Sequence, residues 1–452
     1  MLALLLFACA PAVPPPPAAP DILLISLDTT RADALSAWGR TGGKQTTPNL
    51  DQFASRGARY AWALSSAPST LSSHSTVFTG LDPHGTQIVR NGYALRTDVE
   101  TLTERLAASG YDTIGVLGSS SLGRPMNVDQ GFRLWDETFS EKRAQRHEAQ
   151  AESVTDRAIA ALARHEPGKP VFLFAHYFDA HSPYAPPERF RHRWSEPGKA
   201  KDFGTRDGAL KGLAALIRSG ADPASWSDDL TELHNDYLTE VTYVDEQVQR
   251  LLDGIDLDRT IVVVFGDHGE AFGEIPIRPF GHGMDCDLFE THVPLIVVAP
   301  ERLGGPKPGT VIDTPVGLID IAATILHLAG LPGTLGESQD LSPLWGPTPP
   351  TWSQTWFSEA TVPDVKRTEG WNNLDVERGV AQDGFLLLRS PAEGGPARLY
   401  RIADGQPAVY DPARAAAMDS LLRAWDEKAP PHREANMTDA TKAGLKALGY
   451  AE

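Results

Sequence analysis

Asp267 and His268 stand side by side directly after an apolar, β-branched run at residues 260–265. Carboxylate and imidazole groups are both ligands of divalent cations such as zinc and manganese. Gly266 and Gly269 flank the pair and allow the backbone to turn sharply there. An Asp-His step also fits a solvated turn, so a metal site requires support from other parts of the chain.

A second carboxylate follows an apolar run near the start of the chain, where residues 21–27 lead directly into Asp28. In open α/β sheets, ligands gather at the carboxyl ends of parallel strands, where neighbouring strands end close together. If 21–27 and 260–265 form neighbouring strands, the side chains of Asp28 and Asp267 meet the same cation. The two segments together therefore predict a divalent metal site at one edge of a parallel sheet.

Hydroxyl groups and one histidine crowd the segment 67–80, which is typical of a helix that ends at Gly80. Ser72 or Ser73 is expected to cap the start of this helix. A hydroxyl at a helix N-terminus is well placed to accept an anionic group, because the free N–H groups and the helix dipole stabilise negative charge. The same composition also fits a capped helix without chemistry.

Together these residues resemble the sulfatase family of the alkaline-phosphatase superfamily, and the resemblance extends through most of the chain. Its further landmarks occur in family order at 47–51, 79–85, 90–93, 181–184, 243–246, 281–283, 293–295 and 445–450. The resemblance implies an α/β fold with a mostly parallel central sheet flanked by helices and a small antiparallel carboxyl-terminal subdomain. It also implies a metal-dependent ester hydrolase.

By position in the family, the resemblance implies that Asp28, Asp267 and His268 bind one divalent metal and that the Thr70 oxygen completes the site. A cation on the Thr70 hydroxyl would lower its pKa and neutralise the oxygens of the group under attack. The spacing to Gly80 favours Thr70 as the nucleophile. The alternative hydroxyls are those of Ser69, Ser72 and Ser73.

The resemblance places Asn91, His181 and His282 on the far side of this site. Each can donate a hydrogen bond to a non-bridging ester oxygen, and a protonated histidine near the leaving group can act as general acid. His74 lies one helical turn after Thr70, so it is expected either to contact the ester or to orient the nucleophile. Lone histidines are more often structural, and these roles depend on the family context.

The sequence departs from the sulfatase pattern at the nucleophile. Sulfatases oxidise the cysteine or serine of a Cys/Ser-x-Pro-x-Arg motif to formylglycine, whereas residues 70–74 here begin with threonine and lack the proline and arginine. Oxidation of Thr70 would give a ketone instead of an aldehyde, because threonine carries a methyl group on Cβ. A lysine motif is also absent at 115–120, and Thr29 stands where calcium-binding sulfatases have a second aspartate.

These departures favour hydrolysis of a phosphate or related ester, either a monoester or a diester, through the Thr70 hydroxyl. The first alternative is a sulfatase that acts on sulfuric esters without formylglycine. The second alternative is a catalytically silent binding protein on the same fold. The complete ligand set of Asp28, Asp267 and His268 argues against the silent protein.

Two carboxylates, one imidazole and one hydroxyl make a less oxygen-rich site than calcium prefers, so we expect zinc or manganese before calcium or magnesium. A second metal would have to use Asp179, His181 and His282. Only one residue separates Asp179 from His181, which makes joint ligation from a strand end awkward. A single metal ion is therefore the expectation.

The chain has 452 residues, of which 41% are hydrophobic, enough for one large α/β core and a smaller part. Its formal net charge of −18 disfavours nucleic-acid binding, because phosphate backbones are repelled. A small anionic ester remains compatible with a locally metal-charged site. The sequence identifies neither the substrate nor the oligomeric state.

Residues 1–20 resemble a signal peptide followed by a proline-rich spacer. Residues 6–9 resemble a bacterial lipobox, in which Cys9 would be lipidated and attach the protein to a membrane. We therefore expect an exported bacterial protein, either periplasmic or a membrane-anchored lipoprotein. A basic start is absent, and a disordered leader without export function is the alternative. Cys9 and Cys286 are the only cysteines, so no disulfide framework is indicated.

Strand-like and helix-like runs alternate through residues 21–335, which predicts the catalytic α/β domain. Further strands are expected at 113–117, 171–178 and 294–299, and helices at 99–108, 148–164, 233–252 and 317–329. Residues 336–452 are expected to form the carboxyl-terminal subdomain, packed on the main domain, with short strands at 379–382, 385–389 and 397–401. Residues 188–226 are rich in charge, glycine, serine and proline, which predicts an insertion near the active-site mouth.

Overall fold

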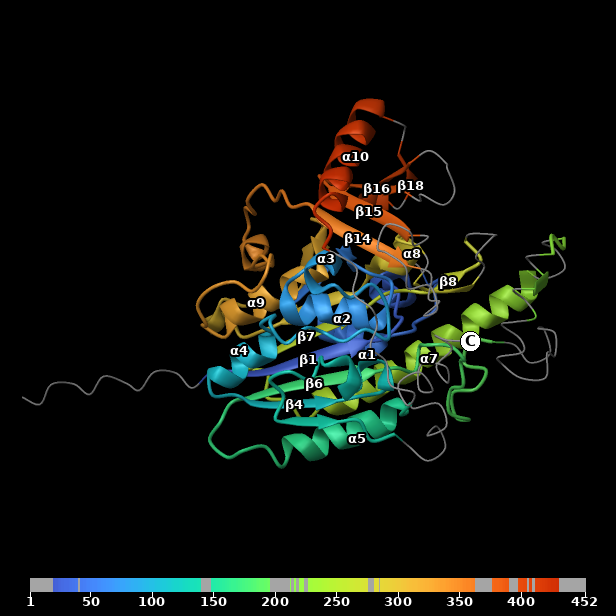
Figure 1. The fold of residues 1–452 in the computed structure, drawn as a ribbon. Coiled ribbons are helices and arrows are strands. Elements are labelled where there is room, and N and C mark those ends of the chain that lie inside the picture. Colours follow the sequence, from blue (N-terminus) through green and yellow to red (C-terminus); the bar gives the residue numbers. More distant parts are fainter. Residues whose placement is uncertain are drawn as a thin grey trace, which may run out of the picture.

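A central sheet of eight strands crosses the computed structural model of the protein (Figure 1). The structure describes residues 19–39, 41–139, 148–195, 212, 215–216, 219–222, 227–274, 280–283, 285–361, 376–389, 397–404, 406–408 and 411–430. The strand order is β12 (Thr310–Ile312), β2 (Ala58–Tyr60), β11 (Leu295–Val298), β7 (Thr260–Gly266), β1 (Asp21–Leu27), β6 (Val171–Tyr177), β4 (Asp112–Val116) and β5 (Leu134–Asp136). Only β11 runs antiparallel to its neighbours, which confirms the expected mostly parallel sheet.

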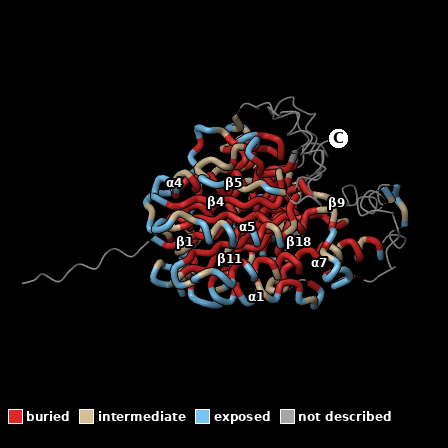
Figure 2. The backbone as a smooth tube through the Cα atoms, turned by 90° about the horizontal axis from the view of Figure 1, so that it is seen from below, coloured by how far each residue is buried: buried red, intermediate tan, exposed pale blue. Residues whose placement is uncertain are grey.

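Alternate residues of β1 enter two different hydrophobic cores, as the two-residue period of a strand requires. Ile22 and Leu24 pack with α2 (Thr70–Thr79), α4 (Leu102–Ala108) and α9 (Ile321–Leu328) on one face of the sheet. Leu23, Ile25 and Leu27 pack with α1 (Pro48–Ala54), α5 (Ala151–Leu162) and α7 (Ser227–Leu252) on the other face. The sheet is therefore covered on both sides, and Figure 2 shows its strands buried in the interior.

The expected helices and strands form, with shifted boundaries. The helix expected at 99–108 begins at Leu102, because Thr101 and Glu104 form a capping box. Helix α7 begins at Ser227, earlier than expected, and the helix at 317–329 consists of η8 (Leu318–Asp320) followed by α9. Shorter elements are β3 (Ala63–Leu64), β8 (Ala271–Phe272), β9 (Phe280–Gly281), β10 (His292–Val293), β13 (Val316–Gly317), α3 (Pro83–Thr86) and α8 (Leu288–Thr291).

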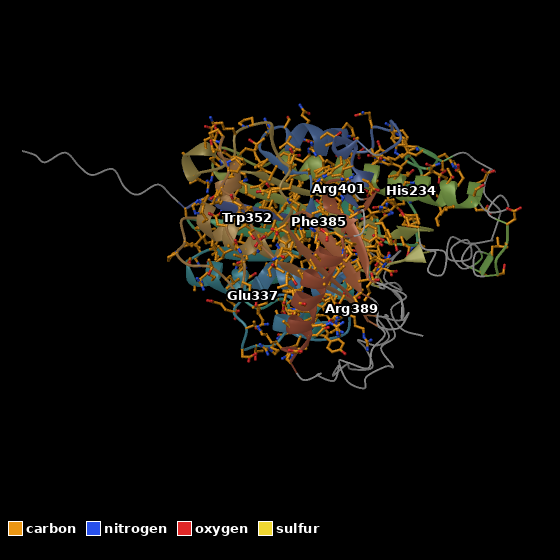
Figure 3. The ribbon with its side chains drawn as sticks, turned by 90° about the horizontal axis from the view of Figure 1, so that it is seen from above. His234, Glu337, Trp352, Phe385, Arg389 and Arg401 are labelled. Atoms are coloured by element: carbon orange, nitrogen blue, oxygen red, sulfur yellow. The ribbon has the colours of Figure 1, made fainter. Side chains whose placement is uncertain are left out.

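A second, antiparallel sheet forms the carboxyl-terminal part, as the sequence predicts. It contains β14 (Trp356–Thr361), β15 (Val376–Gln382), β16 (Phe385–Arg389), β17 (Arg398–Arg401) and β18 (Gln406–Pro407), and α10 (Pro412–Asp426) packs on it. Figure 3 labels Phe385 and Arg389 on this sheet. Trp425 Nε1 donates a 2.5 Å hydrogen bond to Asp82 Oδ2 of the main domain, and the Glu359 N–H donates to the Ser66 carbonyl. These two hydrogen bonds connect the carboxyl-terminal sheet and α10 to the main domain, which carries the predicted metal site.

Several predictions fall on residues outside the described ranges. They are the leader through residue 18 with Cys9, most of the insertion at 188–226, and the tail landmark at 445–450. Among the described residues, no helix is both long enough and apolar enough to span a membrane.

Candidate functional site

The ends of β1 and β7 bring Asp28 and Asp267 together. The two strands are parallel, and Leu27 lies opposite Gly266 in their register, so each carboxylate follows its strand at the same edge of the sheet. Asp28, Asp267 and His268 each offer a ligand atom, and these atoms lie within 4.8 Å of one another. This is the only group of at least three such residues within the described ranges, and all three are buried.

Each of these side chains has one atom fixed by the protein and one atom directed to the common point. Asp267 Oδ1 accepts hydrogen bonds from the backbone N–H groups of Thr29 and His268, at 3.0 and 2.8 Å. Asp28 Oδ2 lies 2.9 Å from His176 Nε2. Asp28 Oδ1 and Asp267 Oδ2 accept no hydrogen bond from any described residue. His268 Nδ1 lies 2.9 Å from the Gly269 carbonyl, so it carries the proton and leaves the Nε2 lone pair free to bind.

The electrostatics of the three side chains favour the binding of a cation. Burial raises the pKa of Asp28 to about 7, and burial followed by the charge of Asp28 raises the pKa of Asp267 well above its usual value. Burial lowers the pKa of His268, which keeps the imidazole neutral. Two buried carboxylates without a cation are costly, whereas two oxygens and one imidazole nitrogen form a suitable ligand set for a divalent metal. These residues therefore fit the metal that the sequence predicts.

Helix α2 begins at Thr70, and its start differs from the sequence prediction. Ser69 occupies the N-cap position without a capping hydrogen bond from its side chain, and Gly80 ends the helix in the left-handed conformation. Ser72 and Ser73 do not cap the helix, and that prediction is wrong. Both lie inside the first turns, where Ser72 Oγ donates to the Ile88 carbonyl and Ser73 Oγ donates to the Asp267 carbonyl.

The Thr70 hydroxyl lies at the metal cluster. Its Oγ1 is 3.4 Å from His268 Nε2, and the side chain is fully buried. Because Ser72 and Ser73 donate their hydroxyl protons to backbone carbonyls, they are poorer candidates for a nucleophile. Ser69 Oγ has no hydrogen-bond partner among the described residues, so it remains the alternative hydroxyl next to Thr70.

His74 lies in the second turn of α2, and its ring contacts the backbone of the first turn. Its Nδ1 is 2.7 Å from the Thr70 carbonyl, which can only accept, so Nδ1 carries the proton and Nε2 accepts from Ser26 Oγ at 2.7 Å. Burial lowers the pKa of His74 well below its usual value. Of the two roles expected for His74, this geometry fits orientation of the nucleophile, because both ring nitrogens are already engaged.

Asn91 fixes the start of α2 from outside the helix. Its Oδ1 accepts the Leu71 N–H at 2.8 Å, which satisfies one of the free N–H groups of the first helical turn. This bond assigns the amide orientation and leaves Nδ2 as a buried donor without a partner among the described residues. Asn91 therefore has a donor to offer beside Thr70.

His181 and His282 lie beside the metal cluster: their ring centres are 5.0 Å apart, and the His282 ring is 4.4 Å from the His268 ring. His181 Nδ1 lies 2.6 Å from the Ser182 carbonyl, and burial lowers the pKa of His181 to about 3, so its Nε2 is an acceptor. Burial opposes a charge on His282, but the Glu270 carboxylate at 3.2 Å from Nδ1 raises its pKa. His282 is thus the better proton donor of the two.

Sequence reasoning missed two side chains of this site, His176 and Glu270. His176 is the sixth residue of β6 and contacts Asp28, while Glu270 accepts from Tyr184 at 3.1 Å and pairs with His282. Glu270 follows His268 by two residues, which was the available signal. For His176 the signal was a polar residue inside an otherwise apolar strand.

The proposed ligands of a second metal do not form such a cluster. Asp179, His181 and His282 are all buried, yet no ion-binding group of three in the described part of the chain includes any of them.

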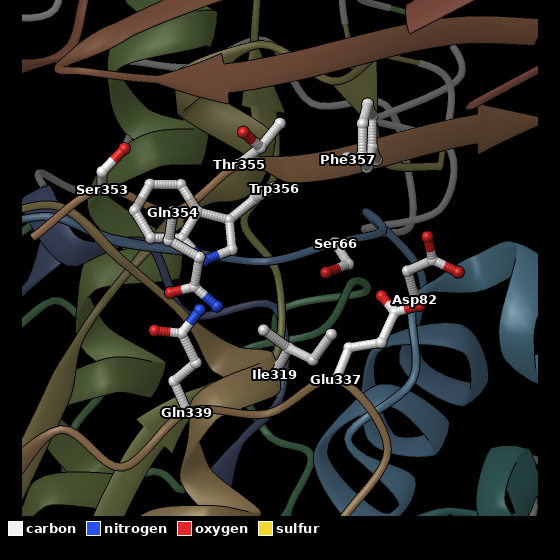
Figure 4. Close-up of a pocket in the computed structure, with 10 residues that line it drawn as sticks. All are labelled: Ser66, Asp82, Ile319, Glu337, Gln339, Ser353, Gln354, Thr355, Trp356 and Phe357. Atoms are coloured by element: carbon white, nitrogen blue, oxygen red, sulfur yellow. The ribbon is translucent and has the colours of Figure 1, made fainter. Parts of the chain in front are cut away.

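A cavity of about 260 Å³ lies between the main domain and the carboxyl-terminal sheet (Figure 4). Asp82 and Glu337 lie on one side of it, and Gln339 and Gln354 lie on the other. Neither Thr70 nor any of the three metal-cluster residues lines this cavity. The cavity is therefore separate from the site at the ends of β1 and β7.

Comparison with known proteins gives a consistent family. A family model described as "Sulfatase" matches residues 20–331, which include the metal cluster and all the candidate site residues. The chain is 23% identical over 379 residues to the arylsulfatase of Clostridium perfringens, a match that covers 69% of this chain and 75% of the relative. It is 22% identical to the N-acetylglucosamine-6-O-sulfatase of Bacteroides thetaiotaomicron, covering 79% of this chain and 78% of the relative.

Solved structures with the same fold include two kinds of hydrolase. A protein solved in complex with its substrate D-glucosamine-2-N,6-O-disulfate superposes with a TM-score of 0.71 and 20% identity, covering 90% of this chain and 97% of the other. The phosphonate monoester hydrolase of Agrobacterium radiobacter superposes with a TM-score of 0.67 and 20% identity, covering 91% of this chain and 96% of the other. These similarities confirm the alkaline-phosphatase-like α/β fold.

Proposed function

Because the chain belongs to the sulfatase family, we propose that it cleaves a phosphate or related ester by attack of the Thr70 hydroxyl. Its relatives and structural neighbours are hydrolytic enzymes, so the chain is a metal-dependent ester hydrolase. The hypothesis of a catalytically silent protein is set aside for that reason. The observation that carries the proposal is the position of Thr70 Oγ1 at the start of α2, next to the inward atoms of the metal cluster.

In this mechanism Thr70 Oγ1 forms a bond to the phosphorus or sulfur atom, and the bond to the leaving oxygen breaks. A divalent cation held by Asp28, Asp267 and His268 would supply the charge that lowers the pKa of the Thr70 hydroxyl and neutralises the transferred group. The N-terminus of α2, which begins at Thr70, directs the positive end of its helix dipole toward the same negative charge. Water then cleaves the covalent ester: its oxygen bonds to the phosphorus or sulfur atom, its proton returns to His282, and Thr70 leaves as the oxygen anion with which the cycle began.

His282 supplies the proton that the leaving oxygen takes. Glu270 lies on its Nδ1 side, so Nε2 is the atom that can donate toward an ester beside His268. Asn91 Nδ2 is an unpartnered donor within the described residues, which suits a non-bridging oxygen of the ester. His181 is held neutral with an acceptor nitrogen, so we assign it to orientation of water or substrate.

The charges of these groups favour a singly charged ester. One divalent cation balances Asp28 and Asp267, and Glu270 balances a protonated His282. These groups leave little surplus positive charge for the second negative charge of a phosphate monoester. A phosphodiester or another monoanionic ester is therefore the favoured substrate class.

A sulfate ester is the second candidate, since it is also singly charged and both relatives described above are sulfatases. Cleavage would then proceed through unmodified Thr70, because a threonine in this position cannot give formylglycine. For the metal we propose manganese or zinc, in keeping with the imidazole in the ligand set.

The experiment that tests this proposal compares an aryl phosphodiester, an aryl phosphate monoester and an aryl sulfate with the same leaving group. Purified protein is treated with chelator and assayed with and without added manganese or zinc. We expect metal-dependent turnover with the diester preferred over the monoester. Preference for the sulfate would select the second candidate, and preference for the monoester would overturn the charge argument.

For the leader we propose export and lipidation at Cys9, which rests on the sequence alone. Expression of the full chain in a bacterium should place it in the membrane fraction, and Cys9→Ala should release it. An unchanged distribution of the Cys9→Ala variant would contradict lipidation.

A further inference from the structure

Thr29 holds an unusual backbone conformation directly beside the metal cluster. Its φ angle is +48°, in the left-handed region, where a β-branched residue is strongly disfavoured. The other non-glycine residues with positive φ in the described ranges are glutamine, asparagine, histidine and aspartate, none of which is β-branched. Thr29 is fully buried, and its hydroxyl has no hydrogen-bond partner among the described residues. Its own side chain therefore does not compensate for the strain.

The strained turn has a direct consequence for a metal ligand. It directs the Thr29 N–H to Asp267 Oδ1 at 3.0 Å. The His268 N–H reaches the same oxygen, so two N–H groups hold Oδ1 and leave Oδ2 toward the cluster. If Thr29 relaxed to a negative φ, its peptide would rotate and this N–H would leave the carboxylate.

A tyrosine from a distant part of the chain fastens the same turn. The Tyr237 hydroxyl donates to the Thr29 carbonyl at 3.0 Å and accepts from the Arg31 N–H at 2.9 Å. It thereby bridges two buried backbone groups on either side of Thr30. Tyr237 lies on α7 and is completely buried, so its ring is held in place by packing.

We propose that Tyr237 is a positioning residue of the metal site, whose hydroxyl holds the strained turn at Thr29 and so aims the Thr29 N–H at Asp267. The inference rests on the metal site of the proposed function and is independent of its nucleophile. Partners that orient metal ligands typically change metal affinity about 10- to 100-fold when they are removed. The hydroxyl of Tyr237 acts one step further away, so we expect a loss of about tenfold.

The test is the affinity of chelator-treated protein for Mn²⁺, measured by isothermal titration without substrate. Tyr237→Phe should bind Mn²⁺ about tenfold more weakly than the parent protein. The matched control is Tyr243→Phe, because Tyr243 is also fully buried on α7 and its hydroxyl accepts from the Glu152 N–H, away from the cluster. Tyr243→Phe should leave Mn²⁺ affinity unchanged. Equal affinities in the two variants would overturn the proposal.

A second variant distinguishes an effect of backbone strain at Thr29 from general damage to the fold. Thr29→Gly accepts a positive φ without steric cost, so it should keep parental Mn²⁺ affinity. In the Thr29→Gly background, Tyr237→Phe should cost less affinity than it does alone, because the turn no longer needs to be held. The same loss in both backgrounds would overturn the role assigned to the strained turn. If the Tyr237→Phe variant does not fold alone, the Mn²⁺ affinity of the double variant is compared with that of Thr29→Gly. A full tenfold loss of affinity in that comparison would contradict the inference.

The readout also separates this inference from the chemistry of the proposed function. If Thr70 proves not to be the nucleophile, Mn²⁺ binding by the Tyr237 and Thr29 variants still decides the positioning role. If the parent protein binds no Mn²⁺ or Zn²⁺ at all, the metal site itself is wrong, and both proposals fail at that common step.

Discussion

His176 Nε2 lies 2.9 Å from Asp28 Oδ2, and both side chains are buried in the interior. The carboxylate can only accept, so Nε2 carries the proton and donates it, while Asp28 Oδ1 remains directed to the metal cluster. Burial lowers the pKa of His176 to about 3, so it is a neutral donor and not a counter-ion. His176 therefore orients Asp28 without cancelling the charge that a metal needs.

Removal of this donor should weaken metal binding. His176→Leu is expected to lower Mn²⁺ affinity about 10- to 100-fold, since Asp28 would lose the bond that fixes its orientation. His176→Gln keeps an N–H near the position of Nε2 and should restore most of the affinity. Isothermal titration of both chelator-treated variants checks this, and equal Mn²⁺ affinities for His176→Leu and His176→Gln would show that His176 acts only through packing.

Thr70→Ala should reduce turnover by at least about a thousandfold, because the variant lacks the attacking oxygen. Thermal unfolding of the metal-free protein should change little, and Thr70→Ser should retain both turnover and metal affinity because it keeps a hydroxyl. Ser72→Ala is the matched control on the same helix, since Ser72 Oγ donates to the Ile88 carbonyl. If Ser69→Ala loses turnover and Thr70→Ala does not, the nucleophile is Ser69.

Metal should stabilise the parent protein but not an Asp267→Asn variant. A metal ion at one hundred times its dissociation constant adds about 2.7 kcal/mol to the free energy of unfolding of a protein that binds it only when folded. Asp267→Asn removes a ligand charge and also relieves the repulsion that raises the pKa of Asp267 beside Asp28. Without metal, the variant should be at least as stable as the parent. Thermal unfolding with Mn²⁺ and with chelator checks this, and full stabilisation of the variant by Mn²⁺ would contradict the ligand assignment.

The pair of Glu270 and His282 predicts a pH window in the metal-free protein. Hydrogen bonding to His282 lowers the pKa of Glu270 below its usual 4.5 despite burial, and Glu270 raises the pKa of His282 above its usual 6.5. The stability from Glu270 is present above pH 4.5 and is lost as the pH falls through its lowered pKa. The stability from His282 is present below pH 6.5 and is lost as the pH rises through its raised pKa.

Glu270→Gln should therefore cost most stability between about pH 4.5 and pH 6.5. The same variant should lower the pKa of His282, since a neutral amide no longer favours the imidazolium. Denaturant unfolding across this range and NMR titration of histidine rings in chelator-treated protein measure the two effects. An unshifted His282 titration in the variant would show that the pair does not interact.

Much of the fold could be predicted from local pattern. The apolar runs at 21–27, 171–178 and 260–265 form the three central parallel strands, because their composition suits burial on both faces. Asp28 and Asp267 were expected together for the same reason, since parallel neighbours end at one edge of the sheet. The helix caps were less predictable: serines fill residues 69, 72 and 73, and local sequence alone does not show which of them precedes the first turn.

The sequence by itself determined which side chains could bind a metal or attack an ester, since those capacities belong to the residue types and to their places after strands. Only the tertiary structure decided how those side chains are oriented. His176 reaches Asp28 across 148 positions of sequence, and Tyr237 reaches Thr29 across 208. These contacts exist because the pairing of β6 with β1 and the packing of α7 on the sheet bury polar groups that must then find partners. No local pattern encodes which partner is nearest.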